Sequence, residues 1–361
     1  VVRCSSRPGG HVEQFVIDGR SIGPASPPYI IAEIGANHNG DLGLCRELID
    51  AAHEAGADAV KLQSWSSSSL VSQAEYGRNT RYVAGNGGGP TLREAVERYQ
   101  LTPDAHVAIV DYCRGRGITC FSSCFSREEV ELLMSLDVPA FKIASMDVNH
   151  LPLLEVVART GRPVLLSTGM ATLGEVERAL SALRVGGAGQ VALLHCVSLY
   201  PTPPALVNLR QLHTWSTAFD VPVGFSDHSL GTAIALGAVA LGACIIEKHF
   251  TLDTKLEGWD HAISADPAQL RALVDGARDL HAALGTTART VPVEEMEKRT
   301  SFRRRMVARR SMRQGERISA GDVDFKRPGT GIQPDELRYV LQRPLVRDVE
   351  AEEELDWADL G

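Results

Sequence analysis

Two short apolar runs of the chain each end in an acid and a histidine. The run IIEKHF (245–250) places His249 two positions after Glu247, and the run GFSDHS places His228 two positions after Ser226. In a β-strand, residues two apart face the same side. Charged side chains are rare at the end of a buried segment unless something there uses or neutralises them. Two histidines at neighbouring strand ends, with carboxylates nearby, indicate a divalent metal site with open positions for water or substrate.

Lysines and hydroxyl groups occupy the ends of other apolar runs. Lys61 and Lys142 supply fixed positive charge. Hydroxyl donors at similar positions are Ser123, Ser145 and Ser226. Cations and hydroxyl donors that lie together are suited to bind an anion, most often phosphate or carboxylate. From the residues alone, the chain is therefore predicted to be a metal-dependent enzyme that acts on a small anionic substrate.

Short apolar, β-branched runs alternate with longer amphipathic stretches along most of the chain. This alternation is the pattern of parallel strands separated by helices. Eight such units predict an α/β fold, a (β/α)8 TIM barrel. The predicted strands are 29–34, 59–63, 118–122, 140–143, 163–167, 191–195, 221–226 and 243–248. A doubly wound sheet is the alternative, because periodicity does not show whether the sheet closes into a barrel. Against this alternative, no G-x-G-x-x-G motif follows any of the predicted strands. The glycine run 85–90 is predicted to be a flexible loop.

Polar residues should collect at the carboxyl ends of the strands if the barrel is correct, because the active site of a TIM barrel lies there. A single polar residue at a strand end can simply cap a helix or contact solvent. Eight polar strand ends in register are hard to explain in that way. The residues concerned are Glu33, Lys61, Gln63, Ser122, Ser123, Lys142, Ser145, Asp147, Ser167, Thr168, His195, Ser198, Tyr200, Ser226, Asp227, His228, Glu247, Lys248 and His249.

The alternation stops near Leu284, which places a TIM-barrel domain over residues 15–284. The following segment, 285–301, is polar and without a pattern, which predicts a linker. Residues 302–361 show short apolar runs broken by turns and are predicted to fold as a small second domain.

Composition and charge argue against several classes of protein. The 361 residues carry a formal net charge of −8, which is unfavourable for a nucleic-acid partner. No apolar run approaches the roughly 20 residues that cross a bilayer, and the first residues lack the apolar centre of a secretory signal. We therefore expect a cytoplasmic protein with no membrane partner. The seven cysteines are odd in number and are expected to be buried, reduced thiols.

Several motifs, taken in order, resemble one enzyme family. They are IIAEIGANHNG, AGADAVKLQ, FKIAS, PVLLSTGM, LLHCVSLYPTP, GFSDHSLG and IIEKHFT, followed by FKRPGTGI. The first seven resemble the sialic acid (nonulosonic acid) synthases, and the last resembles their C-terminal antifreeze-like (SAF) domain. The resemblance runs from about residue 29 to the end of the sequence, and residues 1–14 match nothing in it.

The resemblance implies a transferase that forms a carbon–carbon bond between phosphoenolpyruvate and an amino sugar. The sugar would be a 2-acetamido sugar of the N-acetylmannosamine type, and the products a nine-carbon nonulosonic (sialic-type) acid and phosphate. Members of the family use a divalent ion, so Mn2+ is expected, with Mg2+ or Co2+ as alternatives. His228 and His249 match its ligands, and the ion would act as a Lewis acid on the sugar aldehyde.

The resemblance also assigns roles to individual residues. The catalytic positions are matched by Glu33, Asp147 and Lys142. The positions around phosphoenolpyruvate are matched by Lys61, Ser123, Lys142, Ser145, Ser198 and Ser226. The positions that contact the sugar are matched by Gln63, Tyr200, Asp260 and Arg327. Arg327 matches an arginine that reaches the sugar from the partner subunit, which implies a homodimer with exchanged C-terminal domains.

The sequence departs from the family pattern at two of these positions. Asp147 stands where many members have glutamate, so its carboxylate is one methylene shorter, and Ser198 replaces a common asparagine. The segment 64–100 matches poorly and is expected to shape the sugar pocket. The identity of the sugar therefore stays open.

Two other functions are compatible with parts of the sequence. A related synthase that joins phosphoenolpyruvate to another or a phosphorylated aldose would need extra basic residues for a second phosphate, and the strand ends show no spare basic cluster. A non-catalytic, carbohydrate-binding barrel would have little use for an intact set of ionisable residues. That set is Glu33, Lys61, Lys142, His228 and His249.

Overall fold

The chain forms two compact units, a barrel that ends at Gly285 and a smaller unit over Thr286–Gly361. The structure is a computed structural model, and it describes residues 15–79, 91–327 and 329–361. The N-terminal segment 1–14 and the glycine run 85–90, which was predicted to be a loop, lie outside the described residues.

Eight parallel strands close into a barrel in which the last strand pairs with the first, so the TIM barrel is confirmed and the doubly wound sheet is wrong. The strands are β3 (Tyr29–Gly35), β4 (Ala59–Ser64), β5 (Thr119–Cys124), β6 (Phe141–Ile143), β7 (Val164–Ser167), β8 (Val191–Cys196), β9 (Val223–Asp227) and β10 (Ile245–His249). Nearly all of their residues are buried, because helices cover the outside and side chains fill the inside.

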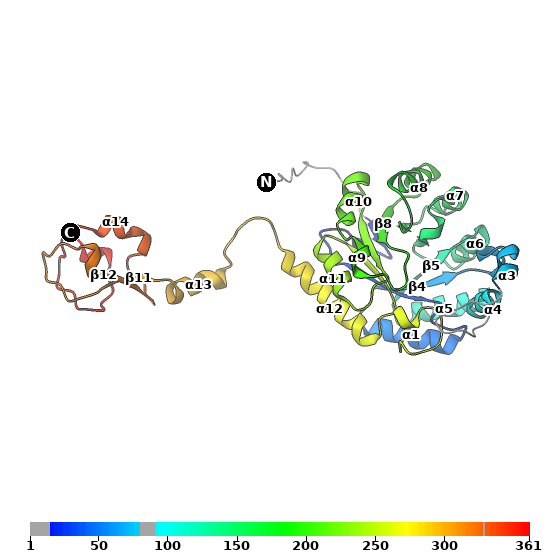
Figure 1. The fold of residues 1–361 in the computed structure, drawn as a ribbon, viewed down its shortest axis with the longest axis horizontal. Helices are drawn as coiled ribbons and strands as arrows, with labels where there is room; N and C mark the ends of the chain where they lie inside the picture. The colour runs from blue at the N-terminus through cyan, green and yellow to red at the C-terminus, as the bar shows by residue number, and fades with distance from the viewer. Residues whose placement is uncertain (1–14, 80–90, 328) are drawn as a thin grey trace. The chain divides into compact units, whose positions relative to one another are not determined.

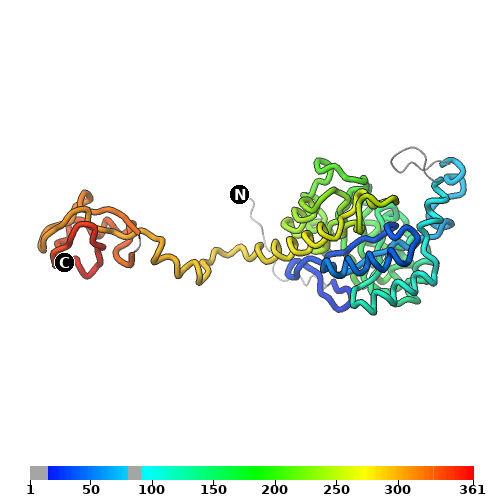
Figure 2. The backbone as a smooth tube through the Cα atoms, turned by 90° about the horizontal axis from the view of Figure 1, so that it is seen from below, coloured from blue at the N-terminus to red at the C-terminus, as the bar shows by residue number. Residues whose placement is uncertain are grey.

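Helices surround the strands (Figure 1). They are α1 (Leu42–Glu54), α2 (Ser67–Leu70), α3 (Gln73–Arg78), α4 (Leu92–Tyr99), α5 (Pro103–Arg116), α6 (Arg127–Ser135), α7 (Leu151–Ala158), α8 (Leu173–Gly186), α9 (Pro204–Val207), α10 (Gln211–Phe219), α11 (Ala233–Ala240) and α12 (Pro267–Leu284). The last of these, α12, contacts α1, which completes the ring of helices (Figure 2).

Helix α8 shows why these segments are helical. Thr172 and Glu175 form a capping box at its start, and Gly187 ends it in the left-handed conformation. Its buried residues recur at helical spacing and face the core: Val176, Ala179, Leu180 and Leu183.

A short hairpin of β1 (Phe15–Ile17) and β2 (Arg20–Ile22) precedes the barrel and contacts the amino-terminal ends of its strands. The backbone N–H of Val16 donates to Gln190, just before β8, and Arg20 forms an ion pair with Asp58, just before β4. The hairpin thus leaves the opposite, carboxyl ends of the strands for a functional site.

The C-terminal unit has a core of its own. Strand β11 (Arg305–Ala308) pairs antiparallel with β12 (Val323–Lys326), and α14 (Leu337–Val340) follows. Its buried apolar residues are Met306, Ala308, Met312, Ile318, Val323, Ile332, Val340, Leu345, Val349 and Leu355. Helix α13 (Val293–Phe302) precedes β11, so the segment predicted as an unpatterned linker contains a helix. Pro292 at its N-cap position and acidic residues in its first turn are the local signals for that helix.

Two expectations from composition can be compared with the described residues. Their six cysteines are all free and buried, as predicted. None of the described helices is long and apolar enough to span a bilayer.

Candidate active site

A cavity of about 330 Å³ opens at the carboxyl ends of the barrel strands, and every strand contributes to its wall. Its lining side chains come from the strand ends and from the loops that follow. They are Glu33, Lys61, Gln63, Ser123, Lys142, Ala144, Ser145, Met146, Ser167, Met170, Cys196, Ser198, Tyr200, Ser226, His228, Glu247 and His249. This is the end of a TIM barrel at which active sites lie.

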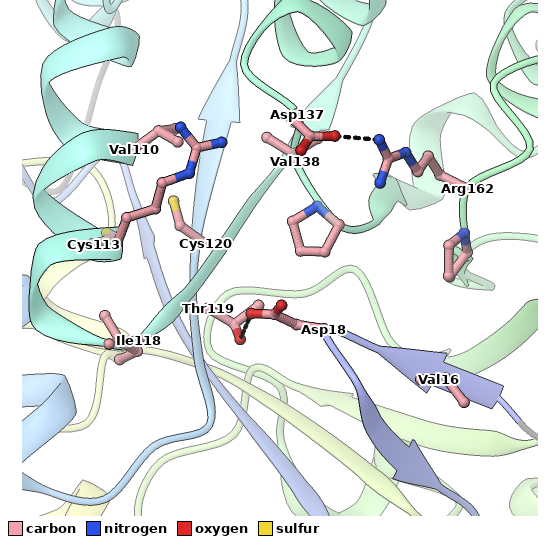
Figure 3. Close-up of a pocket in the computed structure, with 14 residues that line it drawn as sticks. Val16, Asp18, Val110, Cys113, Ile118, Thr119, Cys120, Asp137, Val138 and Arg162 are labelled. Carbon is pink, nitrogen blue, oxygen red and sulfur yellow. Dashed lines mark hydrogen bonds and ion pairs between the residues drawn. The ribbon is translucent and has the colours of Figure 1, made fainter.

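A larger hollow of about 490 Å³ lies at the other end of the barrel, beside the hairpin and the starts of β5, β6 and β7 (Figure 3). Its charged and hydroxyl side chains already have partners: Thr119 donates to Asp18 at 2.9 Å, Arg162 pairs with Asp137, and Arg114 pairs with Asp111 outside the hollow. Because these groups are already paired, they do not converge on a point where a ligand could bind. The smaller cavity is therefore the candidate active site.

Two lysines and two glutamates form a buried, charge-balanced group in the cavity. Lys61 Nζ lies 2.7 Å from Glu33 Oε2 and donates to Ser123 Oγ at 2.9 Å. The same ammonium lies 3.8 Å from Glu247 Oε2, and Lys142 Nζ lies 3.7 Å from Glu247 Oε1. Burying four charges is costly unless they compensate one another. The group therefore holds two cations in the cavity, and the carboxylates beside them offset part of their charge.

The two carboxylates of this group have very different pKa values. Burial raises the pKa of Glu33 to about 7, although the ammonium of Lys61 opposes the shift. Burial also acts to raise the pKa of Glu247, but the ammonium groups of Lys142 and Lys61 outweigh it and lower that pKa to about 2. Glu33 can therefore hold or release a proton near neutral pH, whereas Glu247 stays ionised.

The raised pKa of Glu33 predicts a pH dependence of stability. Because its folded pKa of about 7 exceeds the ordinary value of 4.5, the folded state is favoured at low pH, and this contribution is lost as the pH rises through 7. The free energy of unfolding of the parent protein, relative to that of the Glu33→Gln variant, should therefore fall between pH 5 and 8. Urea unfolding of both proteins across that pH range measures it. The control is Glu94→Gln on α4, whose difference from the parent should stay flat in the same window because hydrogen bonds with Thr91 hold the pKa of Glu94 below its ordinary value. A flat difference for Glu33→Gln would contradict the prediction.

The histidines His228 and His249 face each other with ring centroids 5.4 Å apart. His228 Nδ1 lies 2.9 Å from the carbonyl oxygen of Val197, so it is assigned as the donor, which leaves the lone pair on Nε2. His249 Nδ1 lies 3.6 Å from Asp260 Oδ2 and makes no hydrogen bond. A hydrogen-bonded carbonyl or carboxylate behind the imidazole is the usual support for a metal-bound histidine, and His228 has one. The pair therefore fits a divalent ion.

The two histidines supply few ligands by themselves. Among the described residues, no group of three or more histidine, cysteine, aspartate or glutamate side chains is arranged to hold an ion. An ion bound here would keep most of its coordination positions for water and substrate, which is typical of a catalytic rather than a structural metal site.

A pair of serine hydroxyls converges beside Gly169 in the loop after β7. Ser145 Oγ accepts from the backbone N–H of Gly169 at 3.0 Å, and Ser145 also has a side-chain hydrogen bond with Cys196. Ser198 Oγ is buried and has no hydrogen-bond partner in the structure. A Cβ atom on Gly169 would lie 2.8 Å from Ser145 Oγ and closer still to Ser198 Oγ. Glycine at this position therefore leaves both hydroxyls in place, whereas a larger residue would displace them.

Replacing Gly169 by alanine should therefore weaken binding of the anionic substrate. The added methyl group would displace the hydroxyls of Ser145 and Ser198, and the loss of one hydrogen bond to a charged group corresponds to a roughly 10- to 100-fold higher KM. Steady-state kinetics with each substrate varied in turn would measure it. Gly115→Ala on α5 is the control, because a Cβ there has no neighbour within 4 Å. An unchanged KM in Gly169→Ala would contradict this account of the loop.

Tyr200 and Gln63 lie on the histidine side of the cavity. The Tyr200 ring lies 4.2 Å from the His228 ring, centroid to centroid, and remains 57% exposed. Gln63 Nε2 donates to Glu33 Oε1 at 2.8 Å. An exposed ring and an amide beside a carboxylate are suited to contact a polyhydroxylated ligand.

Three of the residues with predicted roles lie outside the cavity lining. Asp147, in the short 3-10 turn η1 (Ser145–Asp147), has Oδ1 3.5 Å from His150 Nδ1, and its Oδ2 is buried with no hydrogen-bond partner. Burial raises its pKa. Asp260 lies behind His249, at the start of the turn η2 (His261–Ile263). Arg327 belongs to the C-terminal unit, where it is exposed and lies over the Phe302 ring.

The cavity also contains residues that sequence reasoning gave no role. Glu247 faces both lysines and accepts from Ser226 Oγ at 2.8 Å. Its position two residues before His249 was the available signal, because alternate residues of a strand share a face. Met146 and Met170 line the mouth from loops, and no spacing rule could have placed them.

The fold and the cavity define a TIM barrel that carries a buried group of lysines and glutamates and two facing histidines at the carboxyl ends of its strands. Comparison with known proteins gives the family. Residues 48–289 match the NeuB family, and residues 303–361 match the SAF domain. The chain belongs to the NeuB family of nonulosonic acid synthases, which are transferases, and it carries the SAF domain at its C-terminal end.

Relatives in this family have named activities. The chain is 37% identical to the N,N'-diacetyllegionaminic acid synthase of Legionella pneumophila, over 91% of this chain and 93% of that protein. It is 33% identical to the pseudaminic acid synthase of Helicobacter pylori, over 92% of this chain and 98% of that protein. The crystal structure of an N-acetylneuraminic acid (sialic acid) synthetase from Leptospira borgpetersenii, in complex with citrate, matches with a TM-score of 0.71 at 33% identity, covering 80% of this chain and 97% of that chain.

Proposed function

We propose that the protein condenses phosphoenolpyruvate with a 2-acetamido sugar of the N-acetylmannosamine type, releasing phosphate and a nonulosonic acid. The observation that carries the proposal is one cavity that combines a buried lysine and serine group with two histidines. Phosphoenolpyruvate carries a phosphate and a carboxylate, and a cavity with two lysines can match both charges. The named activities of the relatives, which make legionaminic and pseudaminic acids, support the class of product.

The lysines would bind the substrate anion from the floor of the cavity. Lys61 and Lys142 are both buried, so each would lose little conformational entropy when it contacts a ligand. The hydroxyls of Ser145 and Ser198 would donate to the same anion, and Ser123 and Ser226 lie at the strand ends beside them. Together these residues would hold phosphoenolpyruvate in one orientation beside the histidines.

The histidines would hold a divalent ion, for which we propose Mn2+, with Mg2+ or Co2+ as alternatives. When bound, the ion would supply Lewis-acid activation of the sugar aldehyde. His228 and His249 would present their imidazoles from adjacent strand ends, and the Tyr200 ring would cover one side of the sugar. Gln63 would contact sugar hydroxyls, and Asp260 would support His249 or reach the sugar beside it.

Glu33 is the residue best placed to move a proton. Its pKa of about 7 lies near the pH at which a general acid or base is most effective. It also contacts both Lys61 and Gln63, so it joins the proposed anion site to the proposed sugar site. We propose a further catalytic role for Asp147, which from its observed position requires the turn η1 to move toward the cavity.

The cavity does not favour a phosphorylated sugar. Among the described residues that line it, Lys61 and Lys142 are the basic side chains apart from the histidines, and both would be occupied by phosphoenolpyruvate. A second phosphate would need further cations. A non-catalytic carbohydrate-binding role is disfavoured by the buried charged group, which binding of a neutral sugar does not require.

Phosphate release provides the direct test. The purified protein should release inorganic phosphate only when phosphoenolpyruvate, a 2-acetamido sugar and a divalent ion are all present. A panel of 2-acetamido and diacetamido hexoses, each with and without a 6-phosphate, would identify the sugar class from the ratio of kcat/KM values. Phosphate release that is independent of any sugar would reject the proposed condensation.

The proposed working form is a homodimer in which each C-terminal unit completes the partner's cavity. Arg327 is exposed on a unit with a hydrophobic core of its own, so it is free to contact another surface. Three large apolar side chains that line the cavity are also exposed: Met146, Met170 and Tyr200. Exposed apolar side chains at the mouth would suit a surface that the partner's C-terminal unit covers.

A further inference from the structure

A buried ion pair lies directly behind the two histidines. Lys248 Nζ lies 2.7 Å from Asp227 Oδ2, and both side chains are almost completely buried. Neither lines the cavity, because each alternates with a residue that does: Lys248 follows Glu247, and Asp227 follows Ser226. The pair thus lies on the outer face of the sheet, between the barrel and its helices.

The position of this pair in the sheet links it to the metal site. Strands β9 and β10 are paired in register as far as Lys248 and Asp227, which form the last rung of the ladder. The residue after Lys248 is His249, the last residue of β10, and the residue after Asp227 is His228, which directly follows β9. The ion pair therefore joins the two strands at the point where the backbone hydrogen bonds between them end.

The same two side chains also hold the residue on the other side of His228. Lys248 Nζ donates to the carbonyl oxygen of Ser229 at 2.7 Å. Asp227 Oδ1 accepts from the Ser229 backbone N–H at 2.8 Å and from its hydroxyl at 2.7 Å. His228 is consequently held from both sides, and through Lys248 its backbone is connected to the strand that carries His249.

We propose that Lys248 and Asp227 are positioning residues that set the distance between His228 and His249 and thereby the affinity for the divalent ion. The inference rests on the proposed metal-binding role of the two histidines. An ion held by few protein ligands depends strongly on how well those ligands are placed in advance. A purely stabilising role is a poor explanation, because apolar residues can replace a buried ion pair with little loss of stability.

Binding of Mn2+ alone to the metal-free protein tests the proposal without any measurement of activity. Free Mn2+ can be counted by its electron paramagnetic resonance signal during a titration. The decisive variant is Lys248→Met/Asp227→Asn, which removes both charges at similar volume and keeps an oxygen that can accept from Ser229. We expect its dissociation constant for Mn2+ to rise about 10- to 100-fold, the usual effect of losing a residue that orients a metal ligand. Its affinity for phosphoenolpyruvate in the absence of metal should not change.

A second ion pair of the barrel provides a matched control. Arg20 and Asp58 join β2 to the start of β4 at the opposite end of the strands, and Asp58 also accepts from a backbone N–H. Arg20→Met/Asp58→Asn makes the same chemical changes there and should leave Mn2+ affinity unaltered. Lys248→Arg should keep most of the affinity of the parent, because it retains the charge and the donors. The single variant Lys248→Met leaves Asp227 buried and unpaired, so its folding should be checked first by circular dichroism.

The outcomes separate this inference from the function on which it rests. The metal site stands if the parent binds Mn2+ and His228→Ala does not. In that case, a folded Lys248→Met/Asp227→Asn variant that binds Mn2+ as tightly as the parent would show that the positioning role is wrong. If the parent itself binds no Mn2+, Mg2+ or Co2+, both the metal site and the positioning role are wrong. The proposal would also be overturned if Lys248→Met/Asp227→Asn and the control Arg20→Met/Asp58→Asn both bound Mn2+ more weakly than the parent. The effect would then be a general loss of stability.

Discussion

Replacing both His228 and His249 by alanine is expected to abolish turnover. These imidazoles are the proposed protein ligands of the ion, and loss of Lewis-acid activation is worth several kcal/mol, or about 10³-fold or more in rate. Chelation by EDTA should have the same effect on the parent, and added Mn2+ or Mg2+ should restore activity to the parent but not to the double variant. Phosphate release with saturating phosphoenolpyruvate and sugar is the measurement.

An exposed histidine far from the cavity supplies the control for this experiment. His53 lies on the outer face of α1, so His53→Ala should behave as the parent does. Both variants should be compared by thermal unfolding, because two buried imidazoles also fill space. Full activity after exhaustive chelation, or in the His228→Ala/His249→Ala enzyme, would exclude the metal role.

Mixed dimers should regain activity when two inactive chains are combined. The first chain carries Lys142→Ala, which removes a cation from the barrel, and the second carries Arg327→Ala, which removes the proposed contact from the C-terminal unit. Each homodimer should be almost inactive. If C-terminal units are exchanged, the mixed dimer contains one site with an intact barrel and an intact arginine. Random pairing would then leave about a quarter of all sites active.

The alternative arrangement gives the opposite result in the same experiment. If each C-terminal unit serves its own barrel, no combination of the two chains contains an intact site. Heterodimers can be isolated with two different affinity tags and then assayed for phosphate release. Isolated heterodimers that are no more active than the two parents would refute the exchange of domains, and would leave the proposed chemistry of the barrel untouched.

The barrel and the set of polar strand ends could be predicted because both depend on local patterns. Alternating strand and helix patterns predict a parallel barrel, and the period of two within a strand predicts which polar residues face the same side. Lys61 with Gln63, Ser226 with His228 and Glu247 with His249 all line the cavity as that period requires. The helix α13 was missed because its residues are mostly polar, so the hydrophobic period gave no signal.

The sequence by itself determined which groups reach the mouth of the barrel, because period and strand direction are properties of the local chain. Only the tertiary structure decided how those groups act on one another, since that depends on which strands become neighbours. It brought Glu33 close to one lysine and Glu247 close to two, which separates their pKa values although both are buried glutamates. It also placed Asp227 of the neighbouring strand beside Lys248, on the outer face of the sheet. The run IIEKHF therefore contributes to two sites on opposite faces of one strand, and a linear pattern cannot show what lies across from either face.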